Sequence, residues 1–271
     1  MAERTLDTDS VTTAESERQR REKPSIINTL NEKDLRDAFA AGLADFRASP
    51  SFAVVLGLLY PVVALIMTRF ALGYDTLTLI FPLAAGFVLV GPVAATAFYE
   101  ISRRRETGEP IGPGVITRLK GHTVRSVAAV GGVLLVIFTS WLIAALFIAK
   151  ATIGSVGADS VSAFLGAVFT TPAGWAMIVV GNLVGFLFAL LVLAIGALSV
   201  PMLVDRDVGT ATALTTSMSV CRKNKRVMAK WGLFVTAALM AGSIPLFFGL
   251  TAVLPILGHA TWHLYRRAVS F

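Results

Sequence analysis

The chain alternates between long apolar runs and short polar segments rich in lysine and arginine. A helix needs about 20 apolar residues to cross a hydrocarbon core of ~30 Å. Runs of about this length or longer stand at residues 52–70, 76–99, 127–149 and 175–204. Only 15% of all residues are charged, whereas soluble domains have about 25%. The pattern predicts an all-α fold, namely the helical bundle of an integral membrane protein.

A fifth apolar block, residues 231–265, is too long for one simple crossing. As a straight helix it would extend about 50 Å at ~1.5 Å per residue. Gly242, Ser243, Pro245 and Gly249 cluster near its middle and favour a turn there. We therefore expect a hairpin and six transmembrane helices in all, although each arm is short for a full crossing.

The positions of the basic residues predict an orientation, because cytoplasmic loops carry an excess of lysine and arginine. With six spans, every Lys and Arg except Arg69 and Lys150 falls on one side, whereas five spans would export Arg266 and Arg267. We predict a multi-pass protein of a bacterial inner membrane with both termini in the cytoplasm. The formal net charge of +7 then reflects orientation and contact with anionic headgroups of membrane lipids, and not nucleic-acid binding.

The chain divides into three predicted parts. Residues 1–30 are mostly polar and charged and bury too little apolar surface to fold, so they form a disordered cytoplasmic tail. Residues 31–50 form an amphipathic surface helix, and residues 51–271 form the six-span membrane domain.

The predicted amphipathic helix begins at Asn31, a residue type that caps helices well. Leu35, Phe39, Leu43 and Phe46 follow at spacings of about one turn and form one apolar stripe. The helix either lies along the cytoplasmic membrane surface or docks against the protein's own loops. Both arrangements remove the stripe from water.

Mildly amphipathic stretches followed by basic clusters also precede the third and the fifth spans, at residues 115–125 and 208–225. Together with residues 31–50 they predict a threefold repeat of a surface helix and a hairpin of two spans. Identity between the copies is low, and unrelated cytoplasmic loops would carry basic residues as well.

Four stretches of the chain carry a resemblance to a known family: LRDAFAAGLADFRASP at 35–50, PLAAGFVLVGPVAATAFYEISRRRETGEP at 82–110, SVPMLVDRDVGTATALTTS at 199–217, and PILGHATWHLYRR at 255–267. They resemble the bacterial integral membrane family called domain of unknown function 2189, over about residues 35–267. The segment GHATWHLYRR is the most specific part. Some members of that family carry a cytochrome c oxidase label, so the resemblance implies a respiratory complex as one partner to test.

The chain has three histidines, too few for the haem and copper ligands of a catalytic oxidase subunit. Because His122 lies in a predicted loop, only His259 and His263 remain in a span. Their spacing of four places both on one helix face, as a metal or haem site could use. No Cys, Asp or Glu stands near them in the span, so hydrogen bonds to neighbouring helices are the preferred alternative. We predict no metal and no cofactor.

Charged clusters follow the second and the fourth spans. The predicted partner or lipid surface comprises these clusters and the two aromatic residues of the amphipathic helix: Arg103, Arg104, Arg105, Asp205, Arg206, Asp207, Phe39 and Phe46. The clusters could pair across the cytoplasmic face and form a shared polar platform. Solvated loop charges explain them equally well.

Small residues in the fourth span, Gly181 and Gly185 with Asn182 between them, predict a helix-packing face. A homodimer through this face is the alternative.

Cys221 is the only cysteine. Neighbouring Arg222 and Lys223 could lower its pKa, but no base accompanies it, and an inert or membrane-facing thiol is preferred.

Enzyme motifs such as a phosphate loop, a zinc-protease helix or a serine elbow do not occur in the sequence. The spans contain almost no ionisable residues, which disfavours a proton-coupled transporter. We expect a non-catalytic accessory or scaffold protein that binds a membrane partner. A passive or weakly coupled transporter of a small or lipophilic solute and an anionic-lipid-responsive protein are the alternatives.

Overall fold

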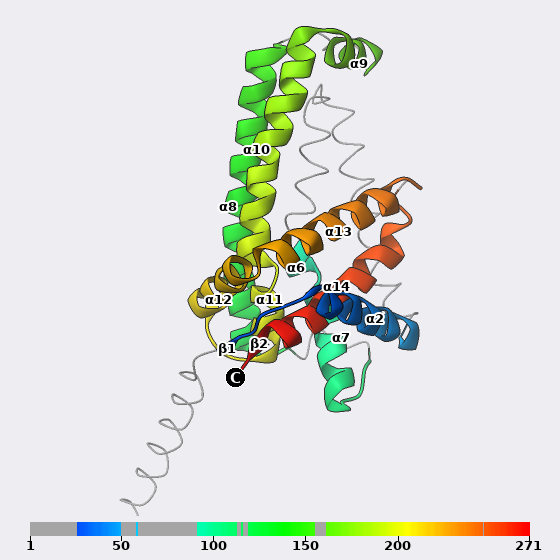
Figure 1. Ribbon diagram of the computed structural model, residues 1–271, viewed down its shortest axis with the longest axis vertical. Coiled ribbons are helices and arrows are strands. Elements are labelled where there is room, and N and C mark those ends of the chain that lie inside the picture. The colour runs from blue at the N-terminus through cyan, green and yellow to red at the C-terminus, as the bar shows by residue number, and fades with distance from the viewer. Residues whose placement is uncertain are drawn as a thin grey trace, which may run out of the picture.

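The computed structural model describes residues 26–49, 58, 91–112, 115, 119–154, 161–245 and 247–271, which are mostly helical (Figure 1). The predicted all-α fold is confirmed for this part of the chain. The predicted span at 52–70 and most of that at 76–99 lie outside the described residues. The described chain resumes with α6, Gly91–Ala94, and α7, Thr96–Thr107.

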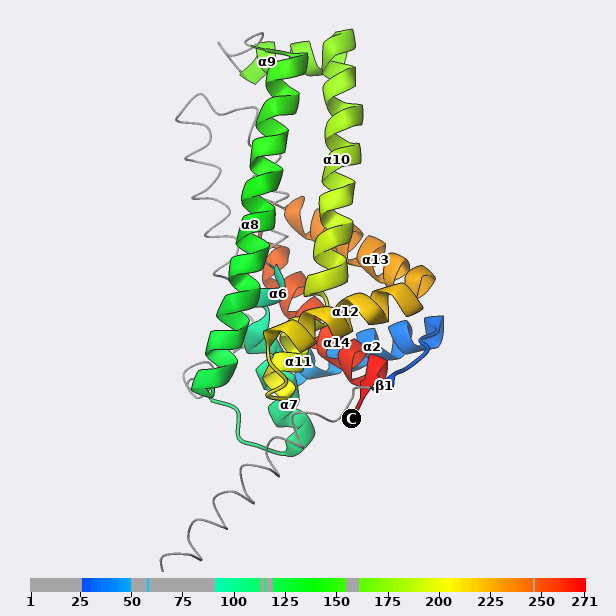
Figure 2. The ribbon, with the colours of Figure 1, turned by 90° about the vertical axis from the view of Figure 1, so that its left-hand side faces the viewer.

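A long helical hairpin projects from the rest of the described chain (Figures 1 and 2). Its arms are α8, Gly121–Thr152, and α10, Pro172–Gly196, and α9, Val161–Thr170, lies at its tip. The second arm leads into α11, Ser199–Asp205. By length and composition, α8 and the run Pro172–Asp205 are the described helices able to cross a membrane. Their apolar windows are only 22% and 11% buried, which fits surfaces that face lipid.

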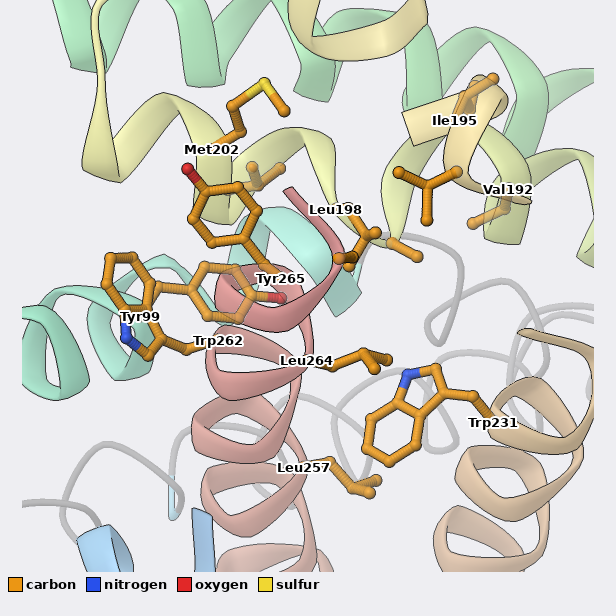
Figure 3. Packing of buried hydrophobic residues seen from close by; sticks show 14 of the residues in the cluster. Tyr99, Val192, Ile195, Leu198, Met202, Trp231, Leu257, Trp262, Leu264 and Tyr265 are labelled. Atoms are coloured by element: carbon orange, nitrogen blue, oxygen red, sulfur yellow. The ribbon is translucent and has the colours of Figure 1, made fainter. Parts of the chain in front are cut away.

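Four helices run across the base of this hairpin in both views (Figures 1 and 2). They are α2, Glu32–Ala48; α12, Thr210–Lys223; α13, Lys225–Ser243; and α14, Leu250–Ala268. We call them the transverse layer. At its centre, Trp262, Leu264 and Tyr265 of α14 are fully buried and pack near Trp231 of α13 and Tyr99 of α7 (Figure 3).

The predicted reversal in the last apolar block is confirmed. Helix α13 ends at Ser243 and α14 begins at Leu250. A Cβ added to Gly249 would lie 2.6 Å from the Gly242 carbonyl oxygen, so the two backbones approach more closely than side chains allow. However, each helix has 19 residues but neither has the hydropathy of a span, and both run across the α8–α10 hairpin. The six-span bundle is therefore not confirmed.

Helix α2 confirms the predicted helix at residues 31–50. The Asn31 side chain accepts the backbone N–H groups of Lys33 and Asp34, and the Asp34 side chain accepts the Asn31 N–H, which completes a capping box. The helix docks on the helix α14 of the same chain, whereas the second alternative placed it against loops. A Cβ at Gly42 would lie 2.4 Å from the backbone nitrogen of Ala260, so this contact requires glycine.

The two described ends of the chain lie together. Strand β1, Ile26–Ile27, pairs antiparallel with β2, Val269–Ser270. The buried Asn224 side chain accepts the Leu30 N–H at 2.8 Å and donates to the Asn28 carbonyl at 3.0 Å. The predicted disordered tail at 1–30 is thus wrong for residues 26–30, because backbone pairing and Asn224 hold them. Residues 1–25 lie outside the described chain.

The predicted threefold repeat is tested in part. Helices α2 and α12 occupy two of the expected surface-helix positions. The third stretch, at 115–125, contains residues 116–118 that lie outside the described chain, and its last part belongs to α8. The repeat stays a prediction.

Candidate functional site

Asp45 is the centre of a buried polar cluster that joins three helices. This α2 residue is only 6% exposed. Its Oδ2 accepts the Ser102 hydroxyl of α7 at 2.5 Å and lies 2.8 Å from Nε2 of His263 on α14. Its Oδ1 lies 2.9 Å from Nε of Arg105 on α7. A single carboxylate therefore ties α2 to both α7 and α14.

His259 completes the cluster and is fully buried. Its Nδ1 lies 2.8 Å from the Ser102 oxygen. Because Ser102 gives its one hydrogen to Asp45, Nδ1–H of His259 must be the donor in this contact. Nε2 then carries a lone pair, and it has no hydrogen-bond partner among the described residues. Burial lowers the pKa of His259 to about 4, although the Asp45 carboxylate opposes the shift. The imidazole is neutral at neutral pH.

Asp45 stays ionised despite its surroundings. Burial alone would raise its pKa, but hydrogen bonds from His263 and Ser102 and the charge of His263 outweigh burial and hold the pKa below its usual value. In this cluster the hydroxyl lies between the carboxylate and the imidazole, whereas a serine hydrolase has the imidazole in the middle. Ser102 is only 1% exposed, so the cluster is a set of buried hydrogen bonds that holds α2, α7 and α14 together.

The predicted histidine pair therefore makes hydrogen bonds to neighbouring helices, the alternative that the sequence favoured over a metal site. The partners come from helices distant in sequence, which supply Asp45 and Ser102. No group of three or more His, Cys, Asp or Glu suited to a metal ion occurs in the described part of the chain.

A charged cavity of about 670 Å³ lies between α7, the start of α8 and the end of α11. Its lining contains members of both predicted charged clusters, together with Glu100: Arg103, Arg104, Asp205, Arg206 and Asp207. Lys120 and His122 at the start of α8 line it as well. The structure thus brings the ends of two predicted spans to one cavity, while Arg105 points away to Asp45.

The α7 wall of this cavity is ordered by its own ion pairs. Glu100 is almost completely buried and accepts Nε–H groups from Arg103 at 2.8 Å and from Arg104 at 2.6 Å. Arg103 also pairs with Glu109 at 2.9 Å. The hydrogen bond to Glu100 raises the pKa of Arg103, and the hydrogen bond from Arg103 lowers the pKa of Glu109. These charges are fixed in place before any ligand or partner arrives.

Helix α14 links the two walls of the cavity. Asp205 accepts the Tyr265 hydroxyl at 2.7 Å and a guanidinium N–H of Arg266 at 3.2 Å. Arg266 also donates to Glu106 of α7 at 3.1 Å, and the Trp262 indole N–H donates to the same carboxylate at 3.1 Å. The predicted platform is therefore joined through the segment GHATWHLYRR. Arg266 of α14 thus contacts Glu106 on the α7 side and Asp205 on the α11 side.

The remaining predicted surface residues lie inside the protein's own contacts. The Phe39 ring meets Phe234 of α13 edge-on, with centroids 5.2 Å apart. Phe46 packs against a buried group that contains Phe98 and Ile101 of α7. Both rings are half-buried, so intramolecular docking accounts for much of the apolar stripe.

The predicted packing face of α10 has a mixed outcome. A Cβ on Gly185 would lie 3.0 Å from the Trp141 ring of α8, so this glycine permits close packing within the hairpin. Gly181 faces open space. Asn182 is exposed and donates to the Ile178 carbonyl of its own helix at 2.7 Å. A homodimer through this face stays a prediction.

Cys221 is a shielded thiol. Burial raises its pKa to about 11, and its Sγ lies 3.6 Å from the Leu193 carbonyl oxygen. The suggestion that Arg222 and Lys223 lower this pKa is wrong, because both side chains are exposed and desolvation dominates. The raised pKa favours the preferred prediction of an inert or membrane-facing thiol, which stays a prediction.

A known protein family matches the part of the chain that contains the hairpin and the cavity walls. The family model described as "Predicted integral membrane protein", domain of unknown function 2189, matches residues 80–205. The matched residues make up a little under half of the chain. The match contains α7, α8, α10 and α11 of this integral membrane protein, and it ends at Asp205 in the cavity. No curated protein and no solved structure matches the chain.

Sequence reasoning missed Asp45, Ser102 and Glu106 as members of the site. One signal for Asp45 is present in α2: Ala38, Gly42 and Asp45 fall on one face and are the buried residues of the helix. Small residues at such spacing mark close helix contacts. Ser102 and Glu106 carry no local signal, because their partners lie on α14.

Proposed function

We propose that this membrane protein is a non-catalytic accessory or scaffold protein whose charged cavity binds a membrane partner. The observation that carries the proposal is the pre-ordered cavity at the base of the apolar hairpin. Arg103 and Asp205 stand on different walls, and each is fixed by ion pairs or hydrogen bonds. Pre-ordered charges give an interface specificity without the cost of ordering flexible side chains.

The proposed location is a bacterial inner membrane, with the cavity and both termini in the cytoplasm. The β1–β2 pairing supports an even number of crossings, because residues 26–27 and 269–270 must lie on the same side. The predicted spans at 52–70 and 76–99, together with α8 and α10, would provide four. This count retains the orientation that the basic residues favour.

The partner class to test first is a respiratory complex, and a second copy of the chain is the other. The non-catalytic part of the proposal is supported by the buried Ser102 and His259, which are arranged as a lock between helices. A purely structural arrangement of this kind holds α7, and hence one cavity wall, against α14.

The test is affinity purification of the full chain in mild detergent, with partners quantified by mass spectrometry. Lys120 is exposed, lines the cavity and forms no ion pair with another described residue, so Lys120→Glu should change the cavity charge and leave the fold intact. Lys33→Glu on exposed α2 surface is the matched control. A cavity-bound partner should fall about tenfold in recovery with Lys120→Glu, equivalent to ~1.4 kcal/mol, and remain with Lys33→Glu.

Equal recovery of every partner in both variants would overturn the cavity as the binding surface. A partner-free, monodisperse protein that passes solute in liposomes would instead favour the passive transporter. Dependence of folding or assembly on anionic lipid alone would favour the lipid-responsive protein.

A further inference from the structure

Helix α13 carries an exposed apolar stripe that the transverse layer does not cover. Leu233, Met240 and Ile244 are 71%, 68% and 83% exposed. They follow one another at helical spacing and lie on the side of α13 away from its buried residues Met228 and Trp231. Large apolar side chains with such exposure in one row mark contact with a membrane or a protein.

The N-terminal half of α13 contacts the α8–α10 hairpin. A Cβ added to Gly232 would lie 2.9 Å from a methyl group of Leu193 on α10. Beyond this contact α13 runs across the hairpin, not along it, in both views (Figures 1 and 2). The apolar stripe thus begins beside a lipid-facing helix and continues in a direction suited to the plane of the membrane.

Basic residues surround the same end of α13. Arg222, Lys223, Lys225 and Arg226 are all exposed and flank the buried Asn224. No carboxylate of the described chain forms an ion pair with Arg222, Lys225 or Arg226. Lys223 differs, because its ammonium donates to the Ile27 carbonyl at 2.6 Å. Within the described part of the chain these three cations thus have no carboxylate partner, and they can bind an anionic ligand.

We propose that α13 is an interfacial membrane anchor: its apolar stripe inserts among acyl chains, and Arg222, Lys225 and Arg226 bind anionic phospholipid headgroups. Cations beside an apolar face are the features of helices that lie in a membrane surface. Continuity with α10 and the charge of the junction identify lipid as the occupant, in preference to a second protein. The proposal goes beyond partner binding by the cavity and assigns α13 a place in the membrane surface, not across it.

The test places a fluorophore sensitive to polarity on a single cysteine in full-length protein in nanodiscs. Cys221→Ala removes the native thiol, Met240→Cys probes the stripe, and Thr107→Cys at the exposed end of α7 is the water-side control. The discs contain phosphatidylcholine with either none or one-third phosphatidylglycerol. The fluorescence of a probe at position 240 should be quenched by nitroxides on acyl chains. Its quenching by iodide should be about fivefold weaker than that of a probe at position 107.

The charge requirement is tested with Arg222→Gln, Lys225→Gln and Arg226→Gln together, which leaves Lys223 and its bond to Ile27 intact. In discs with phosphatidylglycerol, this variant should show about threefold greater iodide quenching at position 240, as should the unaltered chain in discs without anionic lipid. A variant with Lys33→Gln, Arg36→Gln and Arg47→Gln removes equal charge from exposed positions of α2 and should behave as the unaltered chain.

Three results would overturn the proposal. Free access of iodide to position 240 would mean that the stripe lies in water. Protection from iodide without quenching by acyl-chain nitroxides would mean that protein covers the stripe. Protection that is independent of both phosphatidylglycerol and the three cations would remove the headgroup site.

Discussion

Acidification should destabilise this protein through one buried residue, His259. Its pKa is about 4, against a usual value of 6.5, because burial disfavours the imidazolium. In the unfolded chain the residue takes up a proton as pH falls through about 6.5, whereas in the folded chain it does so only near pH 4. The free energy of unfolding therefore falls with pH over this window. At ~1.4 kcal/mol for each tenfold change in proton concentration, the loss at about pH 4.5 is about 2.5 kcal/mol.

The neighbouring groups can be separated from this effect. Asp45 has a lowered pKa, so its contribution is present above its usual value of 3.8 and is lost only in more acidic solution. His263 and Arg105 also face the cluster, and a variant that changes only His259 retains both.

The assay is unfolding of the full chain in mild detergent from about pH 7.5 to about pH 4.5, followed through the buried tryptophans Trp231 and Trp262. His259→Gln is less stable at neutral pH, but it should lack about 2.5 kcal/mol of the acid-induced loss. His122→Gln, at the cavity and outside the cluster, should retain the full loss. Parallel pH profiles for the unaltered chain and His259→Gln would refute the neutral, buried state of His259.

Two further predictions concern packing and reactivity. Gly42→Ala should lower the free energy of unfolding by about 3 kcal/mol in a denaturant titration, because its Cβ would meet the Ala260 backbone at 2.4 Å. The control Gly132→Ala in α8, where a Cβ meets open space, should cause no loss. Equal effects of the two substitutions would contradict the close contact at Gly42. Cys221, with a pKa of about 11 in place of 9.0, should be alkylated at about pH 8 roughly 100-fold more slowly in the folded than in the unfolded chain. Equal alkylation rates would show an open thiol.

Local features allowed much of this fold to be predicted. The cap at Asn31, the apolar runs of the hairpin and the Gly–Pro cluster near Gly242 act over a few residues, so the sequence displays them directly. The final hairpin shows where such reasoning ends. Its hydropathy resembles that of short spans, but α14 is buried by α2, and this contact depends on Gly42, which contributes little to an apolar pattern.

The charged residues of the site were predicted from the sequence, but the contacts that join them to other helices were not. Arg103, Arg104, Asp205 and Arg206 attracted attention as dense local clusters, and all line the cavity. The Asp45–His263 contact joins positions 218 apart, and a single chain carries no local pattern for such a pair. In α2 the aromatic stripe drew attention to Phe39, whereas the closest contact is made by the small residues beside it.

The contacts of α14 couple the buried cluster to the cavity. In its middle this helix presents His259 and His263 to Ser102 and Asp45. Near its C-terminal end, Tyr265 and Arg266 hold Asp205 in the cavity wall. Because the helix is packed along its length, it cannot release α2 without disturbing Asp205. The docking of α2 on α14 is thus a condition for the cavity geometry, and a variant that loosens α2 should weaken a cavity-bound partner although it changes no residue that lines the cavity.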